Sequence, residues 1–475
     1  MHLHAIPVPE PDPTLRVADV TLINCTTRTS KSFSGVRAPQ GCLYLLGAAE
    51  RAGYHVPFRD YQTVSDVDPL NPNVFLDFIT AETRAIALSC MSNLLPLVLF
   101  TTKILKEQDP SKLIILGGIG PSGVADRLME VYPHVDILAL GEGEETFVDL
   151  LDHMHAGKPL SEVCGVLYRD RSGAVQKSQP RSRNRALDGL PDPAYHRINM
   201  QSYETVGIQT ARGCPFPCTF CDVSVYWGRK STYRSIDLVM DEMERLEAFG
   251  FDKVTILDDT FILKRDRVRQ FCQAWTDRGL SIEWSAYCRV DLLDDPLMEM
   301  LADHGCYRVF LGIESGSNNV LSKISKPLDF DHMVRAVKKL QQRVNVRCNL
   351  IWGFPFETME DLKETVHLMF YLRTLGTDVS LSLLSPLPLS TLYEQKQFPI
   401  VLREDLDLQS SVVSSRFFLP DGSALVDGKP VDLIRMIRAE PEVFPGFYTF
   451  EDPLFEEKLA YLTSMGLEVE KLERQ

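Results

Sequence analysis

Residues 211–224 read ARGCPFPCTFCDVS, and the three cysteines of this stretch decide how the rest of the chain is interpreted. Cys214, Cys218 and Cys221 follow the spacing Cys-x3-Cys-x2-Cys, whereas the other cysteines of the chain are scattered. Gly213 and the two prolines within the stretch favour a tight loop with a restricted backbone. The sequence therefore predicts three thiol groups on one short loop.

Three neighbouring thiols indicate a metal centre. Thiolates hold iron–sulfur clusters, normally four at a time. Three thiolates on one loop would leave one iron of a [4Fe–4S] cluster without a protein ligand. The alternative is zinc, which usually takes four ligands, often from paired Cys-x2-Cys units. The sequence has no second Cys or His pair of that kind, although a distant residue would suffice as the fourth ligand.

The chain ahead of the cysteine loop alternates short apolar runs with amphipathic helical patterns. Strands are expected at residues 20–24, 54–60, 85–89, 112–118 and 135–141. Helices are expected at residues 42–53, 94–107 and 144–155, and from about residue 121. This βαβ repetition predicts a parallel sheet of Rossmann type, whose ligand crevice lies outside the carboxyl ends of the strands.

A second α/β rhythm begins next to the cysteine loop. Strands are expected at residues 206–211, 253–259, 282–288, 308–314, 344–353 and 379–385. Helices are expected near residues 235–249, 265–278, 295–304, 331–341 and 359–374, and a last one at 454–463. Six βα-type units predict a barrel or partial barrel with its active site at the carboxyl ends of the strands. The fold class is therefore α/β, a Rossmann-like domain followed by a partial (β/α)6 barrel.

These patterns divide the chain into five parts. The expected parts are a lead-in over residues 1–19, the Rossmann-like domain over 20–160, a hairpin (165–178) and linker within 161–203, the partial barrel over 204–390, and a C-terminal region over 391–475. The C-terminal region is less periodic, and its stretch FPGFYTFEDPLF (444–455) is expected either to line or cover the substrate cavity or to pack as a C-terminal staple.

The composition is that of a globular protein, with 44% hydrophobic and 24% charged residues. A net charge of −15 disfavours nucleic acid as the main partner, because phosphate binding needs a clustered basic surface. No apolar run reaches the ~18–20 residues of a membrane span, and the first residues lack the apolar stretch of a secretory signal. We therefore expect a cytoplasmic protein without a membrane span, whose scattered cysteines are small buried hydrophobes.

The cysteine spacing, with the aromatic Phe220 just before the third cysteine, resembles the radical S-adenosylmethionine (SAM) superfamily. The resemblance covers roughly residues 200–390. It implies that Cys214, Cys218 and Cys221 hold a [4Fe–4S] cluster whose open iron takes the amino and carboxylate groups of SAM. It also implies that an electron donor such as a flavodoxin or ferredoxin reduces the cluster, and that SAM is then cleaved to a 5′-deoxyadenosyl radical.

Four further stretches match this superfamily in order: LDDTF (257–261), YCRVD (287–291), GIES (312–315) and NLIWGFP (349–355). The resemblance implies SAM contacts by Phe220, Asp258, Asp259, Arg289, Glu314 and Gly353. The two aspartates would meet the methionyl amino group, although the family more often has Gly-Gly-Glu there. Arg289 would meet the carboxylate, Glu314 the ribose or amino group, and Gly353 the adenine.

Simpler structural roles are open for several of these residues. Acidic residues at strand ends often cap the next helix, and Asp258 and Asp259 stand in such a place. Arg289 has Asp291 and Asp294 close by in sequence as acidic partners. The flanking matches are therefore weaker evidence than the cysteine spacing.

The first domain resembles the cobalamin-binding module of one large radical SAM subfamily. The matching stretches are APQGCLYLLGAAERAGYHV (38–56), ILGGIGPS (115–122) and ALGEGEETF (139–147). The resemblance implies a cobalamin site formed by Ser89, Ser92, Gly117, Gly118, Gly120, Ser122, Gly141 and Glu142. The alternative is a Rossmann domain that holds a nucleotide or no ligand.

The two resemblances together imply a cobalamin-dependent radical methyltransferase. Its substrate would be an unactivated carbon of a small molecule or natural-product intermediate. A cyclase or rearrangement enzyme with the same cofactors is the first alternative. A non-catalytic corrinoid or metal carrier is an alternative of another class.

Overall fold

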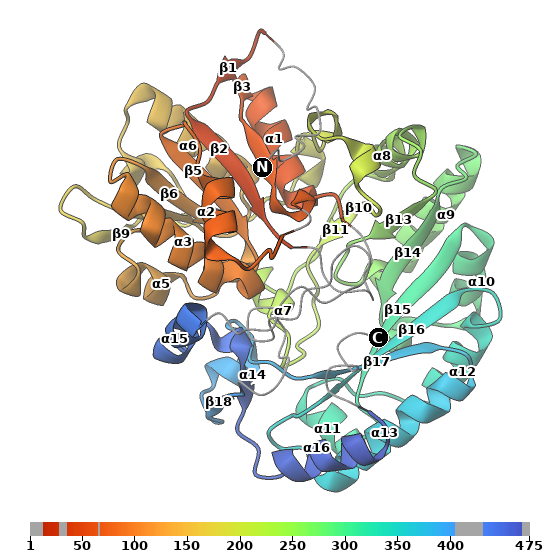
Figure 1. Ribbon diagram of the computed structural model, residues 1–475. Coiled ribbons are helices and arrows are strands. Elements are labelled where there is room, and N and C mark those ends of the chain that lie inside the picture. The colour runs from red at the N-terminus through yellow and green to blue at the C-terminus, as the bar shows by residue number, and fades with distance from the viewer. Residues whose placement is uncertain (1–12, 28–35, 65–66, 404–430, 468–475) are drawn as a thin grey trace. The chain divides into compact units, whose positions relative to one another are not determined.

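The computed structural model describes residues 13–27, 36–64, 67–403 and 431–467 (Figure 1). These residues form two compact units. Unit 1 contains the described residues up to 184, residues 189–204 and residues 431–447. Unit 2 contains residues 185–188, 205–403 and 448–467.

Unit 1 is built on one seven-stranded sheet with the order β4-β2-β5-β6-β7-β8-β9. The five parallel strands are β2 (Val20–Cys25), β4 (Phe58–Asp60), β5 (Ala85–Cys90), β6 (Leu113–Gly117) and β7 (Ile137–Ala139). Their largely apolar, buried sequences are typical of a parallel sheet covered on both faces. The predicted hairpin is confirmed as β8 (Val166–Arg169) and β9 (Val175–Lys177), which extend the sheet with antiparallel strands.

Seven α-helices belong to the described part of unit 1. They are α1 (Gln40–Arg51), α2 (Pro72–Ile79), α3 (Leu95–Gln108), α4 (Ile119–Ser122), α5 (Ala125–Val131), α6 (Glu144–Ala156) and α15 (Val431–Ala439). Helix α1 contacts α6, and α2 contacts α3. The helix expected from about residue 121 is two short helices, and Gly123 lies between them. Helix α2 was not predicted, although Asn71 caps it and Pro72 begins it.

Unit 2 is a six-stranded, all-parallel sheet with the strands in chain order, as expected of a partial barrel. The strands are β10 (Gly207–Ile208), β13 (Lys253–Ile256), β14 (Glu283–Cys288), β15 (Cys306–Glu314), β16 (Asn345–Trp352) and β17 (Asp378–Leu383). The helices between them are α8 (Ile236–Ala248), α9 (Arg265–Asp277), α10 (Asp295–Asp303), α12 (Phe330–Leu340) and α13 (Met359–Thr374). Figure 1 shows these helices along the outer side of the curved sheet.

Two strands expected to be continuous are broken. The segment 54–60 divides at Pro57 into β3 (Tyr54–His55), which pairs with β1 (Arg16–Val17), and β4. Proline has no N–H to donate to a strand ladder. The segment 206–211 divides into β10 and β11 (Ala211–Arg212), and β11 pairs with β12 (Thr232–Tyr233) in a separate sheet. The second break arises where a buried carboxylate takes the backbone N–H groups, as described below.

The C-terminal part of the chain contributes to both units. Helix α15 packs on α3 of unit 1, and Arg127 of α5 donates to Glu440, the residue after α15, at 2.8 Å. In unit 2, β18 (Ile400–Leu402) pairs with β19 (Tyr448–Phe450), and α16 (Phe455–Ser464) packs on α13. Three short helices, α7 (Val223–Tyr226), α11 (Asn318–Lys323) and α14 (Thr391–Glu394), also belong to the described part of unit 2.

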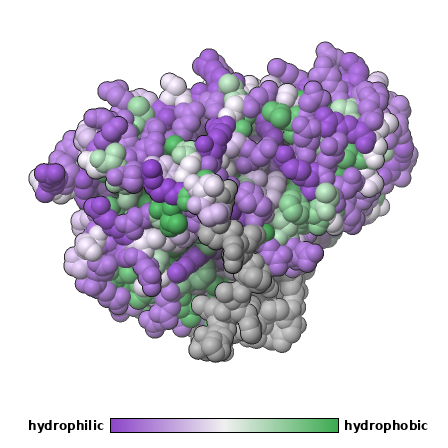
Figure 2. Space-filling view, turned by 90° about the horizontal axis from the view of Figure 1, so that it is seen from above, coloured by the Kyte–Doolittle hydropathy of each residue, from purple (hydrophilic) through white to green (hydrophobic). Residues whose placement is uncertain are grey.

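Large apolar side chains on the surface are scattered rather than gathered. Those exposed include Val17, Met91, Val225, Phe249, Tyr371 and Val431. The face seen in Figure 2 is mostly hydrophilic, with small separate apolar areas. Among the described residues, no helix combines the length and the apolar character that crossing a membrane would require.

Candidate functional site

The cysteine loop leaves β11 through a turn that only glycine adopts easily. Gly213 has φ +99°, in the left-handed region. Its N–H donates to Asp259 Oδ2 at 2.8 Å, which fixes the start of the loop. Cys214 Sγ lies 3.7 Å from Thr260 Oγ1, and the N–H of Cys221 donates to the carbonyl of Cys218 at 3.3 Å. The end of β13 thus positions the first cysteine.

The other two thiols of the loop lie near enough to Cys221 to influence its pKa. Burial is the main cause that raises the pKa of Cys221 to about 12; the charges of Asp222, Cys218 and Cys214 contribute to this rise, and a hydrogen bond with the backbone of Val223 opposes it. Iron binding requires these thiols to lose their protons, so ligation would work against this shift. Within the parts of the chain that the structure describes, no group of three or more His, Cys, Asp or Glu side chains is arranged to hold a single metal ion.

Asp258 is a buried carboxylate whose hydrogen bonds go to the backbone ahead of the cysteine loop. Its Oδ1 accepts from the N–H groups of Thr210 (2.7 Å) and Ala211 (2.8 Å), and its Oδ2 accepts from Thr210 Oγ1 (2.5 Å). Burial raises its pKa to about 6, against the effect of these bonds. Neither Asp258 nor Asp259 caps the next helix, because the N-cap of α9 is Lys264. Asp258 therefore holds β11 in place.

Arg289 reaches the cysteine loop from the end of β14. Its Nη1 lies 3.5 Å from Cys218 Sγ, and its guanidinium stacks 3.8 Å from the ring centroid of Phe216. A two-pronged ion pair with Asp291, at 3.0 Å for each bond, fixes its orientation. Asp294, the other candidate partner, pairs with Arg265 instead. Arg289 therefore combines a structural ion pair with a contact to a cysteine sulfur.

Glu314 adopts a backbone conformation that is rare for a residue with a side chain. Its φ is +69°, where the pairing of β15 and β16 shifts register. Its Oε1 accepts from Lys326 Nζ at 2.5 Å, and both side chains are buried. Such strain costs about 1–3 kcal/mol and is found preferentially at functional sites. The sequence indicated Glu314 but gave no sign of Lys326.

Gly353 stands directly after β16 at a position where any other residue would be strained. Its φ is +84°, and an added Cβ would lie 2.5 Å from Leu383 Cδ1. Its N–H donates to Glu357 Oε2 at 2.9 Å. Phe220 packs against this segment through Phe354, with ring centroids 6.1 Å apart. The structure thus brings the aromatic residue of the cysteine loop to the predicted adenine-binding segment.

A buried lysine links this segment to the C-terminal helix. Lys458 of α16 is fully buried, with Nζ 3.1 Å from Glu357 Oε2 and 2.6 Å from Asp452 Oδ2. Burial raises the pKa of Glu357 to about 7, and Lys458 opposes this rise. No pattern in the sequence indicates this triad.

All eight residues predicted for cobalamin lie at or after the carboxyl ends of β5, β6 and β7. A Cβ added at Gly118 would lie 2.7 Å from the carbonyl oxygen of Cys90, and a Cβ added at Gly120 would lie 2.5 Å from the backbone nitrogen of Ser92. Both glycines therefore allow close packing of the backbone within unit 1. Gly141 has open space around it, which suits close approach by a broad ligand.

Several polar side chains predicted for the cobalamin site already form hydrogen bonds within unit 1. Ser122 Oγ donates to the carbonyl of Gly118 at 2.7 Å, and Glu142 Oε2 accepts from the N–H of Asn184 at 2.6 Å. Gly117 has Ala139 as its nearest side chain, at 3.8 Å from an added Cβ. Ser89 hydrogen-bonds the Cys42 thiol, and Ser92 begins the turn after β5.

The sequence also missed a buried polar network at the same edge of the unit 1 sheet. Asp60, at the end of β4, accepts from Asn24 Nδ2 and from the Tyr203 hydroxyl, each at 2.8 Å. Burial raises the pKa of Asp60, against the effect of these bonds. The network ties residues 189–204 to the sheet.

Two family models match separate parts of the chain. Residues 31–151 match the B12 binding domain, and residues 208–369 match the radical SAM superfamily. The first match covers most of the described parallel sheet of unit 1. The second begins at β10 and ends within α13, so it contains the cysteine loop and the strand ends described above.

Three curated relatives are similar to this chain. An uncharacterized methyltransferase of Pyrococcus horikoshii is 31% identical over 56% of this chain and 59% of its own length. The cytidylyl-2-hydroxyethylphosphonate methyltransferase of Streptomyces wedmorensis is 28% identical over 65% and 67%. The anaerobic magnesium-protoporphyrin IX monomethyl ester cyclase of Cereibacter sphaeroides is 27% identical over 70% and 56%. The chain therefore spans between about half and two thirds of the length of these relatives.

Two solved structures share the fold over 95% of this chain. The radical SAM methyltransferase TsrM of Kitasatospora setae matches with a TM-score of 0.69 and 20% identity, over 91% of its own chain. The cobalamin-dependent radical SAM enzyme OxsB matches with a TM-score of 0.69 and 18% identity, over 66% of its own chain. The two matched domains imply a [4Fe–4S] cluster, SAM and cobalamin as cofactors. The chain therefore has one region that matches the B12 binding domain and a second region that matches the radical SAM superfamily.

Proposed function

We propose that this protein is a cobalamin-dependent radical SAM methyltransferase that acts on an unactivated carbon of a small molecule or natural-product intermediate. The pairing of a B12-binding domain (31–151) with a radical SAM domain (208–369) in one chain carries this proposal. Two of the relatives described above are named as methyltransferases, which favours methyl transfer as the outcome.

In this proposal Cys214, Cys218 and Cys221 hold the [4Fe–4S] cluster. Support comes from the single loop that carries them and from the anchoring of that loop by Asp258 and Asp259. When bound, the cluster and SAM supply a radical that removes a hydrogen atom, and cobalamin supplies the methyl group. The role of the protein is to bind and orient these groups relative to the substrate and to exclude water.

The SAM site is proposed at the carboxyl ends of the barrel strands. Phe220 and Gly353 would border the adenine, and their contact through Phe354 supports a shared pocket wall. Arg289 and Asp259 would stand near the methionyl group, since both contact the cysteine loop. Glu314, fixed by Lys326, would accept from the ribose or amino group. Asp258 would act by holding β11, because both of its oxygens already accept from the backbone or from Thr210.

The cobalamin site is proposed at the carboxyl edge of the unit 1 sheet. Gly117 and Gly141 would allow close approach, Gly118 and Gly120 would shape the loop that carries Ser92 and Ser122, and Ser89 and Glu142 would border the crevice. The open space around Gly141 supports this placement.

The protein further needs a source of electrons, because the cluster must be reduced before SAM is cleaved. We propose an electron donor such as a flavodoxin or ferredoxin, and a reducing cytoplasmic setting.

The second candidate is a radical cyclase or rearrangement enzyme with the same cofactors. The names of the magnesium-protoporphyrin ester cyclases favour it. A non-catalytic corrinoid or metal carrier would have no use for a SAM pocket. Equilibrium binding of SAM to the reconstituted protein separates the carrier from both enzymes.

The test is an anaerobic assay with reconstituted cluster, methylcobalamin, SAM, a reductant and a panel of small molecules followed by mass spectrometry. Methyl transfer predicts 5′-deoxyadenosine together with a product heavier by one methylene unit. The C218S variant is the control and should give neither. Formation of 5′-deoxyadenosine with only cyclised or rearranged products would replace the methyltransferase by the second candidate.

A further inference from the structure

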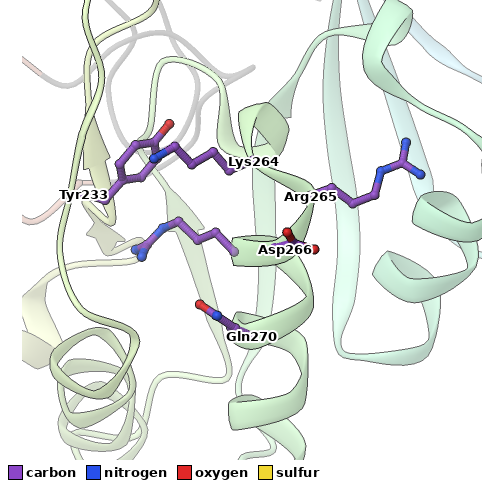
Figure 3. A pocket seen from close by; sticks show the side chains of 6 residues that line it. Tyr233, Lys264, Arg265, Asp266 and Gln270 are labelled. Atoms are coloured by element: carbon purple, nitrogen blue, oxygen red, sulfur yellow. The ribbon is translucent and has the colours of Figure 1, made fainter.

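An open cavity of about 440 Å³ lies in unit 2 between β12 and the beginning of α9 (Figure 3). Its lining residues are Tyr233 on β12 and Lys264, Arg265, Asp266, Arg267 and Gln270 at the start of α9. Three of these side chains are cationic and one is anionic, in a chain whose net charge is −15. The cavity is therefore a local exception to the acidic character of the protein.

Some of the charged side chains that line this cavity form ion pairs, and others do not. Arg265 pairs with Asp294, and Asp266 pairs with Arg269 at 2.6 Å. Lys264 and Arg267 form no ion pair with any carboxylate in the described ranges; instead both face the ring of Tyr233. Lys264 Nζ lies 4.2 Å and Arg267 Cζ 5.2 Å from the ring centroid.

Arg267 shows what this arrangement costs. The side chain is half-buried, and burial lowers its pKa. The charges of Asp258 and Asp188 oppose this shift, but neither carboxylate forms an ion pair with Arg267, and a partly buried cation is unfavourable unless it is paired. A bound anion would supply the missing partner.

The cavity is connected to the cysteine loop through the backbone. Arg267 Nη2 donates to the carbonyl of Thr210 at 3.2 Å, and Thr210 is bound in turn by Asp258. Tyr233 lies opposite Ala211 in the β11–β12 pair, three residues ahead of Cys214. Helix α9 follows the carboxyl end of β13, so the cavity opens at the end of the barrel that carries the proposed active site.

We propose that this cavity binds a phosphate or phosphonate group of the substrate. Lys264 and Arg267 would donate charge-assisted hydrogen bonds, and the Tyr233 hydroxyl and Gln270 amide add neutral donors. Two cations and further donors suit an anion with a charge near −2 and three terminal oxygens better than a carboxylate. The inference rests on the proposed function and deepens it by naming the class of substrate.

The test uses the holoprotein loaded with cluster, cobalamin and SAM, so that its other anion sites are filled. The protein is titrated with inorganic phosphate, methylphosphonate or acetate, and the heat of binding is measured by calorimetry. We expect saturable binding of phosphate and methylphosphonate, about tenfold weaker binding of acetate, and about tenfold weaker phosphate binding in K264Q. R267K keeps the positive charge but loses the planar guanidinium group with its paired N–H donors. It should therefore weaken phosphate binding less than R267Q does.

Lys338 offers the matched control. It also lies over a tyrosine ring, 5.8 Å from the centroid of Tyr371, and forms no ion pair in the described chain. K338Q should leave phosphate binding within about twofold of the wild type. The proposal is overturned if phosphate does not saturate, if K264Q binds it as the wild type does, or if K338Q weakens it equally. Phosphate binding without methylphosphonate binding would indicate a free-phosphate site and overturn the substrate assignment.

Two readouts keep this inference apart from the proposed function. SAM binding is measured in the same samples, and melting temperatures confirm that each variant is folded. Loss of phosphate binding with intact SAM binding overturns only the subsite. Absence of SAM binding in the wild type overturns the proposed function and leaves the phosphate result to be judged by itself.

Discussion

Replacing Lys458 by methionine tests the buried triad that joins α16 to the turn after β16. The change keeps an unbranched side chain that is shorter by one atom and removes the charge, leaving Glu357 and Asp452 buried without a counter-ion. Removing one partner of a buried ion pair typically costs about 3–5 kcal/mol. We expect a loss of this size in the free energy of unfolding of unit 2 at about pH 8.

The loss of stability in K458M should depend on pH, and the pKa of Glu357 determines the direction of that dependence. Its pKa is raised from 4.5 to about 7 in the folded chain, mainly by burial. Between these values the folded chain keeps a proton that the unfolded chain has lost, so this group makes stability fall as pH rises through that window, by at most about 3 kcal/mol. Without Lys458 the pKa of Glu357 rises further. K458M should therefore be less destabilising at about pH 5.5, where Glu357 is neutral, than at about pH 8.

Urea unfolding followed by tryptophan fluorescence suits this comparison, because Trp352 stacks on Phe455 of α16 with ring centroids 5.5 Å apart. Lys339 is the matched control, since it lies between Asp295 (3.3 Å) and Glu299 (2.7 Å) but is partly exposed. K339M should cost less than about 1 kcal/mol. A loss in K458M as small as in K339M, or one that does not change with pH, would refute the reasoning.

Three further substitutions test the cysteine loop and its surroundings. D258N replaces a carboxylate that accepts three hydrogen bonds by an amide, half of which is a donor. It should lower the iron bound per chain after reconstitution and reduce the free energy of unfolding by about 2–3 kcal/mol. Full iron content would contradict the role of Asp258 in holding β11. R289K loses the fork to Asp291 and the stack on Phe216, and should change the electron paramagnetic resonance signal of the reduced cluster while iron content stays unchanged. G353A forces a Cβ against Leu383 at a positive φ, and should weaken SAM binding at least about tenfold; unaltered calorimetric affinity would exclude Gly353 from the pocket wall.

Much of the fold could be predicted because parallel α/β units leave a strong local pattern. Buried strands such as β2 and β5 are continuous apolar runs, and the helices between them carry their own period. The pattern failed where a side chain from elsewhere overrides it. The break between β10 and β11 depends on Asp258, which lies 48 residues from Thr210 and leaves no local trace.

The candidate site divides in the same way. The cysteine loop was predictable because its three thiols are neighbours in sequence. Lys326 and Lys458 were not, because a buried lysine has no sequence signature until its acidic partner is known. The partner of Lys458, Glu357, lies in the turn between β16 and α13, about 100 residues earlier in the chain, and only the tertiary fold brings the two together.

The course of the last described residues has a consequence for dividing this protein into parts. Residues 431–447 belong to unit 1, and residues 448–467, which follow without a break, belong to unit 2. A protein shortened to end at residue 403 would lack α15 in one unit, and both the strand partner of β18 and the buried lysine of α16 in the other. Neither unit is a contiguous piece of sequence, so a single cleavage between them would not release two intact domains. Proteolysis near the C-terminus should therefore weaken both units at once.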